Sequence, residues 1–186
     1  MLIEIRWHGR GGQGVWTASN ILAMAAMLEG KHVQSFPTFG PERSGAPLMA
    51  FTRISDEPIE IHSMIYEPDI VVVLDPTLLG SVNVIEGLKK NGKIVVNFEG
   101  SKEDLYRSLG IREGEYRVFT VPATKIAIEI LGRAITNTAM IGALLKAEPI
   151  VSIESAEKAI KERFKGKLAE QNIQLIRKAY ELTKEV

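Results

Sequence analysis

Two continuous runs of apolar, mostly β-branched residues constrain the fold more than any other feature of this sequence. They are IVVVL at residues 70–74 and the IVV of KIVVN at residues 93–97. Strands that are buried on both faces read as continuous hydrophobic runs, and such strands are typical of parallel sheets covered by helices. Because helical patterns alternate with these and other short runs, we expect an α/β fold.

The alternation predicts a three-layer α/β/α architecture built on a mostly parallel, Rossmann-like sheet. Two strand-like runs flank the turn SDEP at residues 55–58 and predict a β-hairpin insertion. The expected strands are residues 3–8, 32–36, 48–54, 59–63, 70–74, 93–97 and 116–121. The expected helices are residues 14–28, 76–79, 84–90, 101–109 and 123–132.

The C-terminal part of the chain has a different pattern. Residues 136–186 read as three helices, broken at Pro149 and Gly166, with no further strand. A chain of 186 residues suits one domain. We therefore expect a single domain over residues 1–186, with residues 136–186 as its helical C-terminal region.

Composition argues against several classes of function. Lys and Arg together number 23, as do Asp and Glu, so no excess charge attracts nucleic acid or an anionic membrane. No apolar run approaches the ~20 residues that span a bilayer, and we expect a cytoplasmic protein. The absence of cysteine rules out disulfides, thiol nucleophiles and cysteine-ligated clusters in this chain. Three widely separated histidines predict no metal site.

A glycine-rich segment, HGRGGQG at residues 8–14, lies between the first expected strand and the first expected helix. Such a loop presents backbone N–H groups and a helix N-terminus to an anion. A dinucleotide site would also need an acidic residue at the end of the second strand, and that strand has none. Val15-Trp16 replaces the Lys-Ser/Thr of a nucleoside-triphosphate loop. We expect another anionic ligand; the alternative is a tight turn that binds nothing.

A second unusual loop, PTFGPERSGAP at residues 37–47, contains three prolines and two glycines. It follows the second strand, at the sheet edge where ligands bind in open α/β folds. We expect it to lie beside the glycine-rich segment and to bring Arg43 near Arg10. Two guanidinium groups and a helix N-terminus would suit a phosphorylated ligand. The alternative is a solvated surface turn.

Three other polar residues stand near these loops, and each has a structural alternative. Asp75 could be catalytic or could cap the following turn, and Asn137 could contact a ligand or cap a helix. His8 could bind a ligand or serve the core. No nucleophile, base and orienting group occur together, so we expect no catalytic residue and no metal ligand in this chain.

Four segments together closely resemble the gamma subunit of 2-oxoacid:ferredoxin oxidoreductases. They are HGRGGQG, FPTFGPERSGAP at 36–47, EPDIVVVLDPTLL at 67–79 and TNTAMIGAL at 136–144. The resemblance implies a subunit of a complex that decarboxylates a 2-oxoacid, with pyruvate as the expected substrate, and forms an acyl-coenzyme A. Electrons would pass to ferredoxin. The complex would be a heterotetramer with alpha, beta and ferredoxin-like delta subunits.

The same resemblance implies that thiamine diphosphate, Mg²⁺ and [4Fe–4S] clusters belong to the partner subunits. This chain would hold no cofactor alone and would help to bind coenzyme A, a substrate that it shares with its partners. Glu42 would repel a phosphate and is set aside. The residues implied in coenzyme A binding are Gly9, Arg10, Gly11, Gly12, Gln13, Gly14, Arg43, Ser44 and Asn137.

A different class of function remains open from the residues alone. The chain could be a stand-alone, Rossmann-like nucleotide-binding or regulatory module. A self-sufficient dehydrogenase is disfavoured because the ribose-binding carboxylate is missing.

Overall fold

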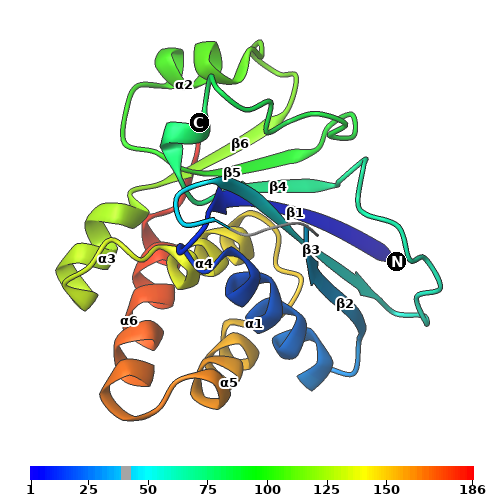
Figure 1. The fold of residues 1–186 in the computed structure, drawn as a ribbon, viewed down its shortest axis with the longest axis vertical. Coiled ribbons are helices and arrows are strands. Elements are labelled where there is room, and N and C mark those ends of the chain that lie inside the picture. Colours follow the sequence, from blue (N-terminus) through cyan, green and yellow to red (C-terminus); the bar gives the residue numbers. More distant parts are fainter. Residues whose placement is uncertain (39–42) are drawn as a thin grey trace.

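A mixed sheet of seven strands organises the part of the chain that the computed structural model describes, residues 1–38 and 43–186 (Figure 1). The strand order is β2-β3-β1-β4-β5-β6-β7. The strands are β1 (Leu2–Arg10), β2 (His32–Pro37), β3 (Pro47–Ser55), β4 (Ile70–Val73), β5 (Lys93–Asn97), β6 (Arg117–Val121) and β7 (Lys184–Glu185). The helices are α1 (Val15–Leu28), η1 (Pro76–Leu78), α2 (Lys102–Leu109), α3 (Ala123–Leu131), α4 (Asn137–Ala147), α5 (Ile153–Arg163) and α6 (Gly166–Leu182).

The α/β fold class is confirmed, whereas the mostly parallel sheet is confirmed only in part. Strands β1, β4, β5 and β6 run parallel, as the β-branched runs predicted. Strand β3 lies between β1 and β2 and is antiparallel to both. Strand β7 is antiparallel to β6.

Three expectations about individual elements were wrong. Residues 59–63 form no strand, and the antiparallel partner of β3 is β2. Residues 84–90 form turns rather than a helix, because Gly87 has a φ of 75°, far from helical backbone. The C-terminal region does contain a strand, since Lys184 and Glu185 of β7 pair with β6.

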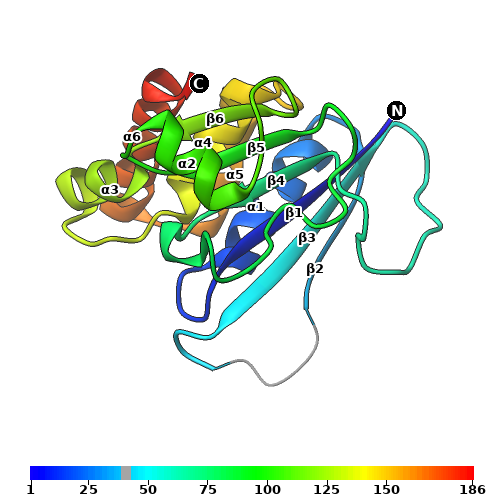
Figure 2. The ribbon, with the colours of Figure 1, turned by 90° about the horizontal axis from the view of Figure 1, so that it is seen from above.

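Helices cover both faces of the sheet, which gives the predicted three layers. Helices α1, α3, α4, α5 and α6 pack on one face, and α2 lies on the other (Figures 1 and 2). The four buried residues of β4 divide between the two cores: Ile70 and Val72 face the first, whereas Val71 and Val73 face the second. This division explains why the sequence of β4 is apolar throughout.

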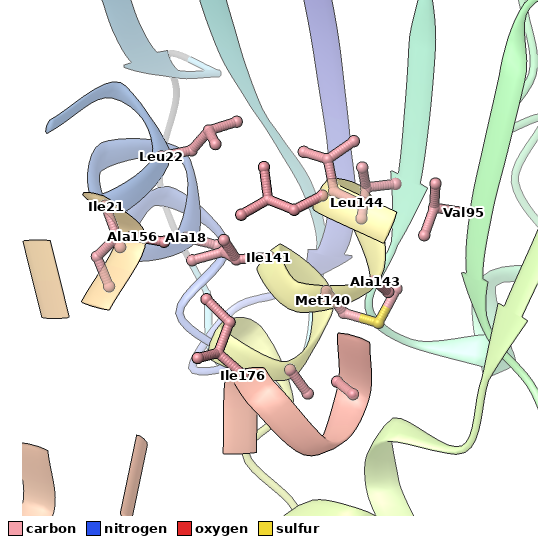
Figure 3. Packing of buried hydrophobic residues seen from close by; sticks show 14 of the residues in the cluster. Ala18, Ile21, Leu22, Val95, Met140, Ile141, Ala143, Leu144, Ala156 and Ile176 are labelled. Carbon is pink, nitrogen blue, oxygen red and sulfur yellow. The ribbon is translucent and has the colours of Figure 1, made fainter. Parts of the chain in front are cut away.

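Helix α4 is the centre of the larger core. Every residue of α4 except Lys146 is buried, and the helix lies between α1, α6 and the sheet (Figure 3). Side chains such as Met140, Ile141 and Leu144 fill the space around it. A helix that is apolar all round is typical of such an enclosed position.

The sheet has a topological switch point between β1 and β4. After β1 the chain continues through α1 to β2, on one side of β1, whereas β4 lies on the other side and leads to β5. In open α/β sheets, ligands bind at the carboxyl ends of the strands at such a point. The glycine-rich loop follows β1 and Asp75 follows β4 closely, so both lie at this edge.

No helix within residues 1–38 and 43–186 combines the length and the hydrophobicity needed to cross a bilayer.

Candidate ligand-binding site

The glycine loop, defined here as residues 9–14, is built around close backbone approaches. A Cβ on Gly11 would lie 2.1 Å from the carbonyl oxygen of Arg43. Gly12 and Gly14 have φ values of 92° and 73°, in the left-handed region that favours glycine. The loop geometry therefore requires glycine at these three positions, whether or not a ligand binds.

Residues 43–47, the described part of the proline-rich loop, lie alongside the glycine loop (Figure 2). The Gly11 amide donates to the Ala46 carbonyl at 2.9 Å, and the Gly45 amide donates to the Gly11 carbonyl at 3.0 Å. The predicted juxtaposition of the two loops is confirmed for this segment. Residues 39–42, which include Phe39 and Glu42, lie outside the described part of the chain.

Arg10 extends from the end of β1 into a polar cluster that joins three segments. Its Nε donates to Thr77 Oγ1 at 3.1 Å and lies 3.2 Å from Asp75 Oδ2. Its Nη1 donates to the Gly45 carbonyl at 3.1 Å. Arg43 is exposed, and its side chain forms no hydrogen bond or ion pair with another described residue. The structure therefore fixes Arg10 in place, whereas Arg43 is exposed and has no side-chain partner among the described residues.

Asp75 is the centre of this polar cluster. Its Oδ2 accepts a hydrogen bond from Gln13 Nε2 at 2.7 Å, and its Oδ1 accepts from the amide and the hydroxyl of Thr77 at 2.9 and 2.7 Å. Burial disfavours the charged form, but the hydrogen bonds from Thr77 and Gln13, with the charge of Arg10, outweigh it and lower the pKa of Asp75. The carboxylate is therefore ionised at neutral pH. The predicted capping role is confirmed, because Asp75 caps η1 through the Thr77 amide.

Gln13 ties the glycine loop to the same cluster. Its Oε1 accepts a hydrogen bond from the backbone amide of Arg10 at 2.7 Å, while its Nε2 donates to Asp75. The side chain thus closes the turn over residues 10–13 and connects that turn to the end of β4.

Asn137 lies next to Gly14, although 123 positions separate them in the chain. Its side chain is buried, with 6% of the residue exposed, and its Nδ2 lies 2.5 Å from where a Cβ on Gly14 would be. Its Oδ1 accepts from the Thr138 amide at 2.9 Å. Asn137 therefore lies where the N-terminus of α4 meets the N-terminus of α1. The N-cap residue of α4 is Thr136, so Asn137 does not have the capping role that the sequence analysis offered as the alternative.

The N-termini of α1 and α4 both lack a side-chain cap and an acidic residue in the first turn. The first N–H groups of a helix have no partner within the helix, and they carry the positive end of its dipole. The two helix ends meet at Gly14 and Asn137, although in α4 the Thr138 amide already donates to Asn137 Oδ1. The arrangement offers backbone N–H groups and a guanidinium, which are groups that suit an anion.

His8 does not join this cluster. It is buried on β1, and its Nε2 accepts a hydrogen bond from Arg6 Nε at 2.9 Å. Burial, helped by the positive charge of Arg6, lowers the pKa of His8 from 6.5 to about 3. His8 is therefore neutral, with its hydrogen on Nδ1, and its role is structural, as a hydrogen-bond partner of the buried Arg6.

The sequence interpretation missed the contacts of Arg10 and Gln13 with Asp75. The available signal was the position of Asp75 directly after the most buried predicted strand, at the same edge as the glycine loop. Among residues 1–38 and 43–186, no three His, Asp or Glu side chains come close enough together to hold a metal ion.

Comparison with known proteins identifies the family of this chain. Residues 4–182 match the family model described as pyruvate ferredoxin/flavodoxin oxidoreductase. The chain belongs to this family. It is 57% identical to the common gamma subunit of the pyruvate/ketoisovalerate oxidoreductases of Pyrococcus furiosus, over 98% of this chain and 97% of that protein. It is 55% identical to the pyruvate synthase subunit PorC of Methanocaldococcus jannaschii, over 96% of each chain.

A solved structure of the same family has the same fold. The pyruvate oxidoreductase subunit PORC of Thermotoga maritima superposes with a TM-score of 0.88 at 41% identity, over 98% of this chain and 97% of that one. The resemblance to gamma subunits that the four sequence segments indicated is confirmed.

Proposed function

We propose that this chain is the gamma subunit of a 2-oxoacid:ferredoxin oxidoreductase, with pyruvate as the substrate, and that its glycine loop forms part of the coenzyme A site. The complex would convert the 2-oxoacid to acyl-coenzyme A and pass electrons to ferredoxin. The names of the relatives support both the proposed enzyme class and the proposed assignment as the gamma subunit.

One observation carries the proposed role in coenzyme A binding. The glycine loop, Arg10 and two uncapped helix N-termini converge at the carboxyl ends of β1 and β4. Coenzyme A carries a pyrophosphate and a further phosphate, which are the groups that such a positive, N–H-rich edge would bind. The residues proposed to contact it are Gly9, Arg10, Gly11, Gly12, Gln13, Gly14, Arg43, Ser44 and Asn137.

The composition of this chain agrees with the division of cofactors among subunits that the family resemblance implies. Without cysteine it cannot ligate an iron–sulfur cluster through thiolates. We propose that thiamine diphosphate, Mg²⁺ and the [4Fe–4S] clusters reside in the alpha, beta and ferredoxin-like delta partners. This chain would supply binding groups and interface, and no catalytic residue.

The test is substitution of the two arginines in the enzyme assembled with its partner subunits. Arg10→Ala and Arg43→Ala should each raise the KM for coenzyme A about ten- to a hundredfold, because a hydrogen bond to a charged group contributes roughly 1.5–3 kcal/mol. Decarboxylation of pyruvate measured without coenzyme A should not change.

Arg107→Ala is a matched control, since this exposed arginine on α2 pairs with Asp104, outside the cluster. It should leave the KM unchanged. If both Arg10→Ala and Arg43→Ala also leave the KM for coenzyme A unchanged, the glycine loop does not bind coenzyme A.

A further inference from the structure

The hydrogen bonds around Arg10 form a relay that fixes the plane of its guanidinium group. We propose that Thr77 and Asp75 are positioning residues, which hold Arg10 in the orientation that meets a phosphate of coenzyme A. This inference rests on the proposed function. It adds two residues that would act through Arg10 and not by touching the ligand.

The hydroxyl of Thr77 has only one hydrogen, and the structure shows where it goes. Thr77 Oγ1 donates to Asp75 Oδ1 at 2.7 Å, so its lone pairs are left to accept from Arg10 Nε at 3.1 Å. The hydrogen bond to Asp75 thereby fixes the direction from which the Thr77 hydroxyl oxygen accepts a hydrogen bond. A guanidinium is planar, so fixing Nε and Nη1 fixes the whole group.

The second anchor of Arg10 comes from the segment at residues 43–47. Nη1 donates to the Gly45 carbonyl at 3.1 Å, and the Gly45 amide is itself bonded to Gly11. Arg10 is thus held from two sides, by the η1 turn and by the segment next to the glycine loop. Its Nη2 donates no hydrogen bond to the residues that the structure describes.

Asp75 is itself immobilised, as a positioning residue must be. It accepts two hydrogen bonds from Thr77 and one from Gln13, and only 10% of its side chain is exposed. Its negative charge also offsets part of the positive charge of Arg10. Changing Asp75 would therefore alter both the charge of the cluster and the orientation of Arg10. Changing Thr77 would alter only the orientation of Arg10.

The experiment compares Thr77→Val with Thr77→Ser in the assembled enzyme. Valine has nearly the shape of threonine but cannot accept from Arg10, so the KM for coenzyme A should rise about three- to tenfold while turnover at saturating coenzyme A is retained. Serine keeps the hydroxyl and should restore a KM close to that of the wild type. Thr77 is exposed, and unfolding midpoints of both variants should match the wild type.

A double variant separates positioning from a general structural effect. If Thr77 acts through Arg10, then Arg10→Ala/Thr77→Val should have the same KM as Arg10→Ala alone. The inference would be overturned if the two substitutions raised the KM independently, so that the fold-change of the double variant equalled the product of the two single fold-changes. It would also be overturned if Arg10→Ala raised the KM and Thr77→Val left the KM unchanged. If Arg10→Ala itself leaves the KM unchanged, the role of Arg10 in coenzyme A binding fails, and this inference fails with it.

Discussion

At the scale of single residues, the pairing of Arg6 with His8 places two basic side chains together in the interior of the sheet. Arg6 donates from Nη2 to the carbonyls of Val84 and Glu86 at 3.0 and 2.6 Å, and from Nε to His8. Because the imidazole must accept this hydrogen bond, protonation of His8 would cost both the bond and the burial of a second charge.

This arrangement predicts that the chain loses stability in acid through His8. The pKa of His8 is about 3 in the folded chain, below its ordinary value of 6.5, so between these values the unfolded chain binds one more proton. The free energy of unfolding should fall as pH is lowered through this range, by up to about 1.4 kcal/mol per pH unit from this group.

Urea titrations from pH 7 to pH 4 measure this contribution. His8→Gln, in which an amide oxygen can accept from Arg6, should show a shallower fall than the wild type. His32→Gln, at an exposed position on β2, is the matched control for the change of histidine to glutamine. Equal slopes in the wild type and His8→Gln would show that His8 titrates normally.

The residues of the candidate site divide into those that the sequence could reveal and those that it could not. The glycine loop and the proline-rich loop could be placed together, since both follow strands at one sheet edge. The contact of Arg10 with Asp75 spans 65 positions and depends on the register of β1 against β4. No local pattern encodes that register, so the partners of Arg10 could not be predicted.

At the scale of elements, the approach of α4 to α6 depends on Gly142. A Cβ at this position would lie 2.3 Å from the backbone oxygen of Ile176 on α6. Helical propensity alone would favour alanine over glycine by roughly 1 kcal/mol. The backbone contact should reverse this preference, because neither helix can move without disturbing a closely packed core.

We therefore expect Gly142→Ala to destabilise the chain by about 1–3 kcal/mol, the usual cost of overpacking a core. Gly142→Val should cost more, since its extra methyl groups enter the same gap. The midpoint of urea unfolding measures both effects. A more stable Gly142→Ala variant would mean that α6 shifts freely and that the packing in Figure 3 is loose.

The element predictions succeeded where local chemistry decides and failed where distant contacts do. The β-branched runs form β4 and β5, as predicted. A strand that is buried on both faces needs apolar residues at consecutive positions, and this pattern is visible in the local sequence. Residues 59–63 also have strand character, but a side chain of β2 holds their backbone, since Gln34 Nε2 donates to the Ile61 carbonyl. Directly after this stretch, Arg53 Nη2 of β3 donates to the Met64 carbonyl. Gly87 has a φ of 75°, which is incompatible with the predicted helix, and it packs against Tyr66 where a Cβ would lie 2.0 Å from the carbonyl oxygen.

At the scale of the whole molecule, we propose that Trp16 contacts a partner subunit. It stands in the first turn of α1, beside the glycine loop, and 49% of it is exposed. Exposed tryptophans are frequent anchors in protein interfaces. The other tryptophan, Trp7, is buried and donates to Thr52 Oγ1 at 2.9 Å.

On the proposed assembly, Trp16→Asp should prevent this chain from co-purifying with its three partner subunits after co-expression. The chain alone should keep its circular dichroism spectrum, because Trp16 is already 49% exposed and lies outside the buried core. Met27→Asp, near the other end of α1 and 60% exposed, is the matched control and should co-purify normally. Retention of Trp16→Asp in the complex would show that this surface is not the interface.

The position of β3 between β1 and β2 also has a consequence for how the protein is made. Strand β1 is synthesised first, yet its two neighbours, β3 and β4, are complete only at residues 55 and 73. Until residue 55 is made, both edges of β1 have no partner in the sheet, and the edge that pairs with β4 has none until residue 73. Unpaired strand edges on a growing chain promote aggregation. The edge of β1 that pairs with β4 is thus one that a ribosome-bound chaperone would have to protect after β2 and β3 have paired.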